Sequence, residues 1–485
     1  LALAGTLGPL GHRLLEESLS LAVAAIEGPV SQGPGNGARK LGALEVRDEA
    51  PSARARRGRA GFAVRDFTIQ ELANTAWSFS TLFCCDGPLL DAISSASRRK
   101  ISEFASQDLA NTSWAFSRLS YGDSPLRNAI AAQALPMLSA SSLSPSEVAQ
   151  SRSGLSGDAK DILSLVEALE TAGRLSGDVL GAAEAALQLQ AAALDGLVAP
   201  PASCLRLPGP GASASKPFAL LMQPRLCVLW KPPGWAASAA VDEEALSEEA
   251  KRVGPGLLVR EWLAENSSQQ LPILQDADAT HGLVHRLDRN TSGALLWAGT
   301  YAGLLAARLQ FAAHRVRKEY VCLCWGWMPL APQNLEAPLL ERSSDWGMSR
   351  SVVASYGRRS HTEITAVGHL WVDLSAAAQP LLPGGDAGTI AVSLVEVRLH
   401  TGRLHQIRAH LSHEGHPLVG DADYGSGTEN WCPRIFLHAC RLAIDIGDGP
   451  IDLSVSLPED LREVLRIVRP ADVRGGTLLD RWLYE

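Results

Sequence analysis

This chain of 485 residues lacks several features that would assign it to a class directly. No apolar run reaches the roughly 18 residues that a membrane span requires. The eight cysteines contain no CxxC pair, and Cys322 and Cys324 are too close together for an ordinary disulfide or for paired zinc knuckles. We therefore expect a protein without membrane spans, in which the thiols are buried and reduced, as is usual inside cells.

An excess of basic residues is also missing, because the net charge is −8, which at first argues against a nucleic-acid partner. The charges are unevenly distributed, however. Residues 235–280 hold nine acidic and three basic side chains, whereas residues 285–320 hold six basic and two acidic ones. Much of the acidity lies in one segment, so the overall charge does not exclude RNA.

Length and composition favour two or three folded domains with a sizeable core, since 46% of the residues are hydrophobic. Residues 1–66 contain a Gly/Pro/Ser-rich stretch and a basic run at 54–59, and we expect them to be poorly ordered. Residues 199–217 are rich in Pro, Gly and Ser and predict a linker. The chain begins with Leu rather than Met, so we expect a fragment or a processed form.

An internal repeat lies within residues 67–198. The segment 67–80, FTIQELANTAWSFS, recurs at 104–117 as FASQDLANTSWAFS, an offset of 37 residues. A second apolar segment follows each copy and begins at Pro88 or Pro125, and proline suits the first turn of a helix. Two helices per unit with a period in the thirties predict an α-solenoid.

The apolar residues of each copy recur at helical spacing, as Leu72, Ala76 and Phe79 do, and predict the core face. Residues 162–187 keep this spacing without the tryptophan and are expected to form a third, degenerate unit. We expect Trp77 and Trp114 to pack inside the repeats.

These copies resemble the helical repeats of octotricopeptide-like organellar RNA-binding proteins. The resemblance covers about 120 residues. It implies a helical region that contacts RNA or protein, and it favours a chloroplast or mitochondrial location.

The sequence pattern changes at residue 218, and the new pattern extends to residue 485. Short apolar runs alternate with helical stretches, which is typical of an α+β domain. A helix is expected around residues 304–311, and strands are expected at 226–230, 321–323, 364–367, 390–399 and 435–437.

Four motifs stand out in this region. They are KPPG at 231–234, HRLDRNTSG at 285–293, RKEYVCLCWG at 317–326, and the run from LHTGRLHQIRAHL to GHPLVGDADYG at 399–425. The second places one carboxylate, Asp288, among cations at a turn before an apolar strand, which suggests a prepared nucleophile or base. An apolar strand that ends in the rigid Pro-Pro-Gly turn of the first motif places Lys231 at a sheet edge.

Together, the order and spacing of these motifs resemble the RluA-type pseudouridine synthase family, over roughly residues 218–468. The resemblance implies the pseudouridine synthase fold, with a central mixed or antiparallel sheet. It also implies isomerisation of specific uridines in RNA to pseudouridine, without metal or cofactor. Trp230, Pro233 and Leu404 depart from the residues usual in the family, but none stands where chemistry is expected.

The resemblance implies three catalytic residues. Asp288 is the catalytic aspartate, and Arg408 would pair with it and favour its ionised form. Tyr320 would stack on the target uracil and assist in moving a sugar proton. The route, by attack on the sugar, by attack on the ring or through a glycal, stays open.

Further residues are expected to contact the RNA or the substrate. Arg286 would enter the RNA beside the flipped nucleotide, and Leu437 would line the pocket under the base. Lys231 and Lys318 would contact phosphate or brace the site. The fourth motif adds three residues to the set, namely Arg403, His405 and Gln406.

Two other hypotheses remain open. One is an RNA-binding adaptor on a synthase-like scaffold, which requires a broken catalytic set. The other is a metal-dependent hydrolase, but the spacings of His405, His410 and His413 do not match the helical pair of HExxH sites. We expect a monomer whose partner is rRNA, tRNA or mRNA.

Overall fold

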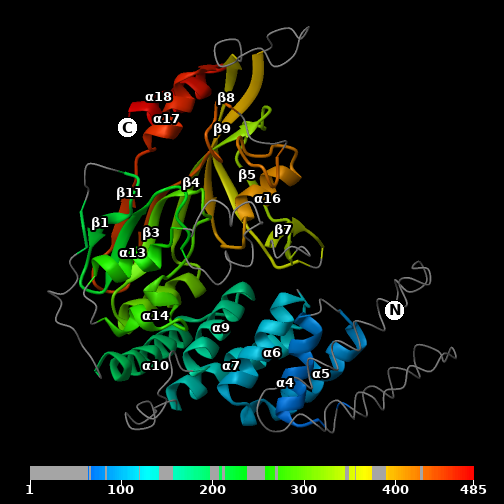
Figure 1. Cartoon of the computed structure of the whole chain (residues 1–485). Coiled ribbons are helices and arrows are strands. Elements are labelled where there is room, and N and C mark those ends of the chain that lie inside the picture. The colour runs from blue at the N-terminus through cyan, green and yellow to red at the C-terminus, as the bar shows by residue number, and fades with distance from the viewer. Residues whose placement is uncertain are drawn as a thin grey trace. The chain divides into compact units, whose positions relative to one another are not determined.

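Two compact units make up the chain, and they are described separately (Figure 1). One comprises Leu1–Ser146 and Ser156–Leu189, and the other Glu147–Leu155 and Gln190–Glu485. The computed structural model describes residues 64, 67–81, 85–119, 121–140, 157–196, 207–209, 214–237, 257–267, 271–343, 349–355, 357–373, 389–425 and 430–484. Apart from Val64, the predicted N-terminal segment 1–66 lies outside these residues, as does most of the predicted linker, so the domain boundaries stay a prediction.

The first unit is helical where the repeat predicts helices. Its elements are α4 (Ile69–Thr81), α5 (Gly87–Lys100), η1 (Ile101–Glu103), α6 (Ser106–Arg118), α7 (Ser124–Ala140), α9 (Gly157–Thr171) and α10 (Gly177–Gly196), the last of which runs on into the second unit. Helix α5 begins at its Gly-Pro pair, where the Asp86 carboxylate accepts a hydrogen bond from Leu89 N at 3.1 Å. The first helices of successive units, α4, α6 and α9, pack against one another. Membership of the octotricopeptide-like class stays a prediction.

Burial within the repeats agrees with the predicted apolar faces but not with the predicted tryptophans. Leu72 and Ala76 are buried, as is Phe116 of the second copy, whereas Phe79 is half-buried. Trp77, in contrast, is 40% exposed, so the expectation that it packs in the core is wrong. Trp114 is half-buried and lies under the guanidinium of Arg118, 4.8 Å from the ring centroid.

The second unit is built on a ten-stranded sheet of order β1-β2-β3-β10-β4-β9-β8-β12, with β11 on β10 and β5 on β8. A separate ribbon pairs β6 with β7. The strands are β1 (Phe218–Met222), β2 (Leu226–Lys231), β3 (Ser292–Ala298), β4 (Arg317–Trp325), β5 (Gln333–Leu335), β6 (Leu339–Ser343), β7 (Ser349–Val353), β8 (Thr362–Asp373), β9 (Thr389–Leu399), β10 (Leu437–Ile444), β11 (Ile451–Ser454) and β12 (Val468–Pro470).

This sheet is mixed, as predicted, because β10 runs parallel to β3 and antiparallel to β4. One sequence expectation needs correction. The strand expected at 435–437 begins only at Leu437, since the chain is still leaving the turn before it. Lys231 is the last residue of β2, where the strand meets its turn, and β2 lies between β1 and β3 in the sheet.

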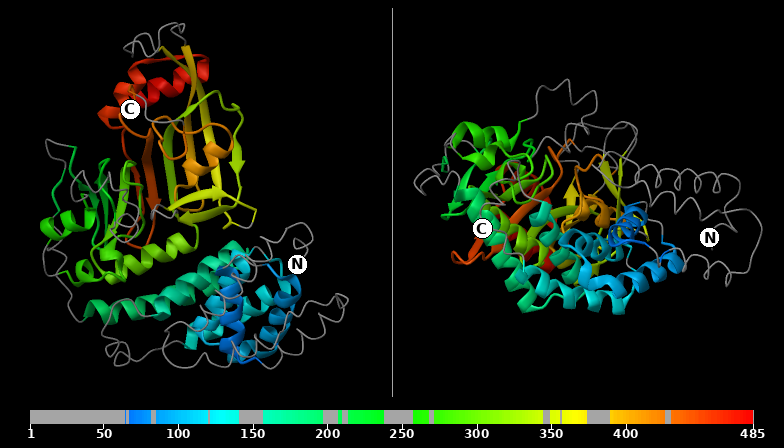
Figure 2. Two further views of the ribbon diagram at one scale, coloured as in Figure 1. Left: turned by 45° about the vertical axis from the view of Figure 1, so that its right-hand side comes forward. Right: turned by 90° about the horizontal axis from the view of Figure 1, so that it is seen from below.

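Helices cover the sheet of the second unit. They are α13 (Val259–Asn266), α14 (Tyr301–Ala312), α16 (Gln406–His413), α17 (Glu459–Arg466) and α18 (Val473–Tyr484), with the short turns η3 (Pro272–Gln275) and η4 (Thr280–Gly282). Figure 2 shows α17 and α18, in red, beside the long strands β8 and β9. Leu461, Leu465 and Leu478 pack there against Val321 and Leu394 in one core cluster.

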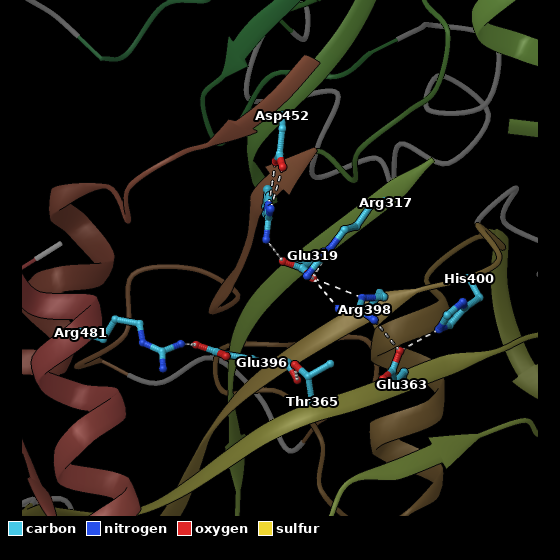
Figure 3. A network of polar contacts seen from close by, with 10 residues as sticks. Arg317, Glu319, Glu363, Thr365, Glu396, Arg398, His400, Asp452 and Arg481 are labelled. Carbon is cyan, nitrogen blue, oxygen red and sulfur yellow. Dashed lines mark hydrogen bonds and ion pairs between the residues drawn. The ribbon is translucent and has the colours of Figure 1, made fainter. Parts of the chain in front are cut away.

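A network of ion pairs crosses this sheet from β11 to β8 (Figure 3). Glu319 on β4 lies at its centre, with Arg317 at 2.6 Å and Arg398 at 3.1 Å. Arg398 continues to Glu363, whose carboxylate contacts His400 at 2.8 Å. Burial opposes ionisation of Glu319, but the two arginines outweigh it and hold the pKa of its carboxyl below the ordinary value.

The network predicts acid-sensitive stability. A carboxyl whose folded-state pKa is lowered stabilises the fold above its unfolded pKa, and the contribution disappears as the pH falls through the folded pKa. We expect Glu319→Gln to lower stability at pH 7 by about 1 kcal/mol, because the arginines lose their shared partner. The difference should shrink as the pH falls below the ordinary glutamate value and through the lowered folded-state pKa of Glu319. Urea unfolding of both proteins across this range tests it, and a difference that does not depend on pH would contradict the account.

Candidate active site

Asp288 lies in a turn between η4 and β3. The turn closes through Thr291 N, which donates to Asp288 O at 3.0 Å. Strand β3 then begins at Ser292, and its second residue, Gly293, has a φ of 129°. A Cβ at this position would lie 2.2 Å from Ala439 O on β10, so only glycine allows the two strands to approach so closely. The motif's glycine therefore fixes the turn against the sheet.

Lys231 holds this turn from beneath. Its side chain is 0% exposed. The ammonium donates to the carbonyl oxygens of Pro232 at 3.1 Å, Arg289 at 3.0 Å and Thr291 at 2.7 Å. Three carbonyls match the three N–H groups of an ammonium. Lys231 was expected either to contact phosphate or to brace the site. Its three N–H groups all bind carbonyl oxygens of the site, which fits bracing and leaves no N–H group for phosphate.

His285 anchors the start of the same motif. Its Nε2 accepts from Leu296 N at 3.0 Å, and its ring stacks on Phe311 with centroids 5.3 Å apart. Burial, with a further contribution from the Lys318 charge, lowers the pKa of His285 to about 3. His285 is therefore a neutral structural residue, and Asp288 is the acidic group that the motif presents.

Arg408 on α16 contacts Asp288, as expected, but other carboxylates bind it more closely. Its Nη1 lies 3.5 Å from Asp288 Oδ2. Asp421 holds the other edge of the guanidinium through Nε at 2.8 Å and Nη2 at 2.7 Å, and Asp423 also binds Nη2. Burial alone would lower the pKa of Arg408, but the hydrogen bonds with Asp421 and the charge of Asp288 raise it. The guanidinium is a permanent cation that turns Nη1 toward Asp288.

Tyr424 supports this arrangement from one face. Its ring lies 4.9 Å from the guanidinium carbon of Arg408. Its hydroxyl donates to Ser351 O at 2.9 Å and accepts from Ser351 N at 2.8 Å, which ties the ring to strand β7. Asp421 is held by the backbone N–H groups of Asp423 and Tyr424. The side chains that orient Arg408 are thus themselves fixed.

Tyr320 lies on β4, between Ala439 of β10 and Val397 of β9. It is 8% exposed. Burial and the nearby Asp288 charge raise its pKa, so the phenol stays protonated. Leu437 is opposite Cys322, two residues along β4, and therefore faces the same side as Tyr320. The Tyr320 ring and the buried Leu437 therefore share one face of the sheet, and the Asp288 charge acts on Tyr320.

Lys318 faces this side too, since it is two residues from Tyr320 on the same strand. Its ammonium lies 5.3 Å from the centroid of Phe311. Burial, with a contribution from the Arg403 charge, lowers the pKa of Lys318 to about 8. Arg403 is half-buried, and its Nε donates to Arg359 O at 3.2 Å. The two cations therefore lie close enough to affect each other.

The remaining predicted residues divide into two groups. Arg286 is exposed, and His405 approaches Asp288, with Nε2 4.0 Å from Oδ1. Gln406, in contrast, is 2% exposed. Its amide accepts from Thr401 Oγ1 and donates to Thr362 Oγ1 and His361 O, so it supports its own loop instead of making the RNA contact expected for it.

Sequence reasoning assigned no function to Asp421, Asp423 and Tyr424, although the fourth motif contains them. The sequence signal that could have identified them is the segment GDADY at 420–424. It places two carboxylates and an aromatic ring 13 to 16 residues after Arg408. Within the described residues, no group of three or more His, Cys, Asp or Glu is placed to hold a metal ion. The helices described are all too short or too polar to cross a membrane.

Known proteins share this sequence pattern. Residues 225–413 match the model of the RNA pseudouridylate synthase family. The chain is 31% identical to tRNA pseudouridine synthase C of Salmonella typhi over 223 residues, which are 43% of this chain and 81% of that protein. It is 32% identical to ribosomal large subunit pseudouridine synthase D of Zymomonas mobilis, over 39% of this chain and 57% of that protein.

A solved structure, human RNA pseudouridylate synthase domain containing 1, covers 57% of this chain and 98% of its own, with 21% identity and a TM-score of 0.38. The sequence relatives are more similar, and the match to the Salmonella typhi protein extends over four fifths of its length. The chain therefore belongs to the RNA pseudouridine synthase family.

Proposed function

We propose that this chain is an RluA-type RNA pseudouridine synthase in which Asp288 is the catalytic carboxylate, with Arg408 and Tyr320 as its partners. The observation that carries the proposal is the meeting of these three side chains from separate segments. Asp288 contacts Arg408 Nη1 at 3.5 Å, and burial together with the Asp288 charge raises the pKa of Tyr320. All three expected catalytic residues are present, whereas an inactive RNA-binding adaptor would lack at least one of them.

The arrangement suits the chemistry of the reaction. Breaking the C1′–N1 bond requires a group that attacks the sugar or the ring, or that removes a sugar proton, and an ionised carboxylate serves each route. Arg408 places a positive charge 3.5 Å from the Asp288 carboxylate, and Asp421 holds that guanidinium in position. The ring of Tyr320 offers a face to the uracil, worth about 1–3 kcal/mol per stacked base, which offsets the few kcal/mol that flipping a nucleotide costs.

We also propose that the substrate is a structured RNA of the tRNA or ribosomal class, since the relatives act on these two. Arg286 is exposed in the same turn as Asp288 and would enter the gap left by the flipped nucleotide. Mapping pseudouridine in the RNA of cells with and without this gene tests the proposal. A site that disappears with the gene supports it, and an unchanged map in every RNA class would contradict it.

Lys318 gives a prediction about phosphate binding. A buried lysine with a lowered pKa costs stability at neutral pH, and the cost vanishes above the unfolded pKa, near 10.4. We expect Lys318→Met to stabilise the fold at pH 7 by about 1–3 kcal/mol. If Lys318 contacts a phosphate, the same change weakens RNA binding. The slope of the logarithm of the binding constant against the logarithm of the salt concentration then falls by about one. Thermal unfolding and titrations at several salt concentrations test both effects, and unchanged RNA affinity would contradict the phosphate contact.

The helical repeats are proposed to aid RNA binding. Deleting residues 1–200 should weaken RNA affinity and broaden the choice of uridine, because a solenoid adds contact area far from the reacting base. Competition binding and site mapping with the full chain as reference measure the change. If affinity and site choice stay the same, the repeats do not guide the enzyme.

A further inference from the structure

We propose that His405 is the base that removes the C5 proton of the target uracil, an inference that rests on the proposed function. Forming pseudouridine moves C1′ from N1 to C5. Whichever route Asp288 follows, C5 must lose its hydrogen and N1 must gain one. The reaction therefore needs a group that accepts one proton and returns one.

The hydrogen bonds of Tyr424 fix the tautomer of His405. The single hydroxyl hydrogen of Tyr424 is donated to Ser351 O at 2.9 Å. Toward His405 Nδ1, 3.3 Å away, the hydroxyl oxygen has only a lone pair to offer. The proton must therefore be on Nδ1, which leaves Nε2 of the neutral ring unprotonated.

This free lone pair lies beside the catalytic carboxylate. His405 Nε2 is 4.0 Å from Asp288 Oδ1. Within the described residues Nε2 has no hydrogen-bond donor, and the side chain is 16% exposed. The charged groups that act on the ring are Asp288, Arg408, Asp423 and Arg286. A substrate atom placed against Asp288 is thus within reach of Nε2.

The backbone holds the ring there under strain. His405 has φ 50° and ψ 29°, a left-handed conformation that costs free energy for a residue with a side chain. The position is maintained on both sides: Ala409 N donates to His405 O at 2.9 Å, and the side chain of Gln406 fastens the preceding loop. A strained histidine that is held this firmly points to a function for its ring.

The other side chains of the site are poor bases. Burial raises the pKa of Tyr320 and keeps its phenol protonated. Lys318, with a pKa of about 8, is mostly an ammonium at neutral pH. Arg408 is a permanent cation, and Asp288 is engaged in breaking the glycosidic bond. Burial lowers the pKa of His405, so its ring is neutral and able to accept a proton.

The step balances as follows. After C1′ has joined C5, that carbon carries both C1′ and hydrogen, and the ring holds an N1=C6 double bond. Nε2 takes the hydrogen as a proton, and the C–H electron pair forms C5=C6. The N1=C6 pair moves to N1, which receives the proton back from the imidazolium. His405 ends neutral, and no other reactant is needed.

The variant that isolates Nε2 is His405→Asn. Asparagine tolerates the left-handed conformation, and its amide can donate to Tyr424 in place of Nδ1, but it has no atom at Nε2. We expect single-turnover rates to fall by about 10²- to 10⁴-fold with RNA affinity within about twofold. RNA containing 5-deuterouridine should then react more slowly than unlabelled RNA by a larger factor than with the wild type, because C5 deprotonation has become rate-limiting.

Two further variants secure the interpretation. His413→Asn makes the same change at an exposed position at the other end of α16 and should keep the wild-type rate. His405→Gly relieves the left-handed strain and leaves room for added imidazole, which should restore part of the rate. A His405→Asn enzyme with the wild-type rate, or a slow one without the enlarged isotope effect, overturns the inference. A wild-type protein that makes no pseudouridine overturns the proposed function itself.

Discussion

Asp288→Asn is expected to lower the rate of pseudouridine formation by roughly 10⁴-fold or more, as when a nucleophile is removed from other enzymes. Asparagine has the same shape but carries no charge, so Arg408 keeps Asp421 and the fold should be unchanged. RNA affinity should stay within about twofold, because the carboxylate acts on the bond and not on the backbone phosphates. Nucleoside analysis of RNA after single turnovers measures the rate.

Asp452→Asn is the matched control for this prediction. Asp452 pairs with Arg441 at 2.7 Å on the same sheet, but its side chain is 51% exposed and lies in the network of Figure 3. Its variant should retain the wild-type rate. Activity of Asp288→Asn within tenfold of the wild type would remove Asp288 from the chemistry.

Asp421→Ala is expected to have the largest effect on stability. Asp421 is 1% exposed and binds two nitrogens of a guanidinium that is itself 8% exposed. Breaking a buried ion pair by removing one partner costs about 3–5 kcal/mol, because the remaining charge stays buried. The rate should also fall by about 10²-fold, since Arg408 can turn away from Asp288.

An exposed ion pair with the same two-bond geometry shows how much of the stability loss comes from burial and how much from the paired hydrogen bonds. Arg441 and Asp452 form the two-bond contact at 2.8 and 2.7 Å, but Arg441 Nη1 also has Glu319 at 3.5 Å and both side chains reach solvent. Asp452→Ala should cost at most about 1 kcal/mol. Urea unfolding of both variants makes the comparison, and equal losses would show that Asp421 is not a buried anchor.

Much of the fold could be predicted because the sequence pattern is local. The repeat at an offset of 37 residues located the helices of the first unit, and apolar runs located strands such as β3. Trp77 was misjudged, since helical spacing identifies the apolar stripe but a large aromatic beside it also favours burial. The Pro-Pro-Gly turn located the end of β2 at Lys231, whereas the pairing of β2 with both of its neighbours depends on distant segments.

Part of the site could be predicted from motifs, and part depends on tertiary contacts. The family resemblance implies that Asp288 and Arg408 pair, although 120 residues separate them. It does not indicate that Asp421 holds Arg408, because a carboxylate in a turn looks the same whether it binds solvent or a guanidinium. Likewise, the amide of Gln406 is a side chain that could contact RNA. Only its buried hydrogen bonds show that it supports the loop.

Release of tritium from RNA that carries 5-³H-uridine is the most direct test of the central claim. Each conversion replaces the hydrogen at C5 with C1′, so label must enter water at the rate at which pseudouridine forms. The account predicts release by the wild-type protein and none above background by Asp288→Ala. Tritium release that survives Asp288→Ala would contradict the assignment of Asp288 as the catalytic carboxylate.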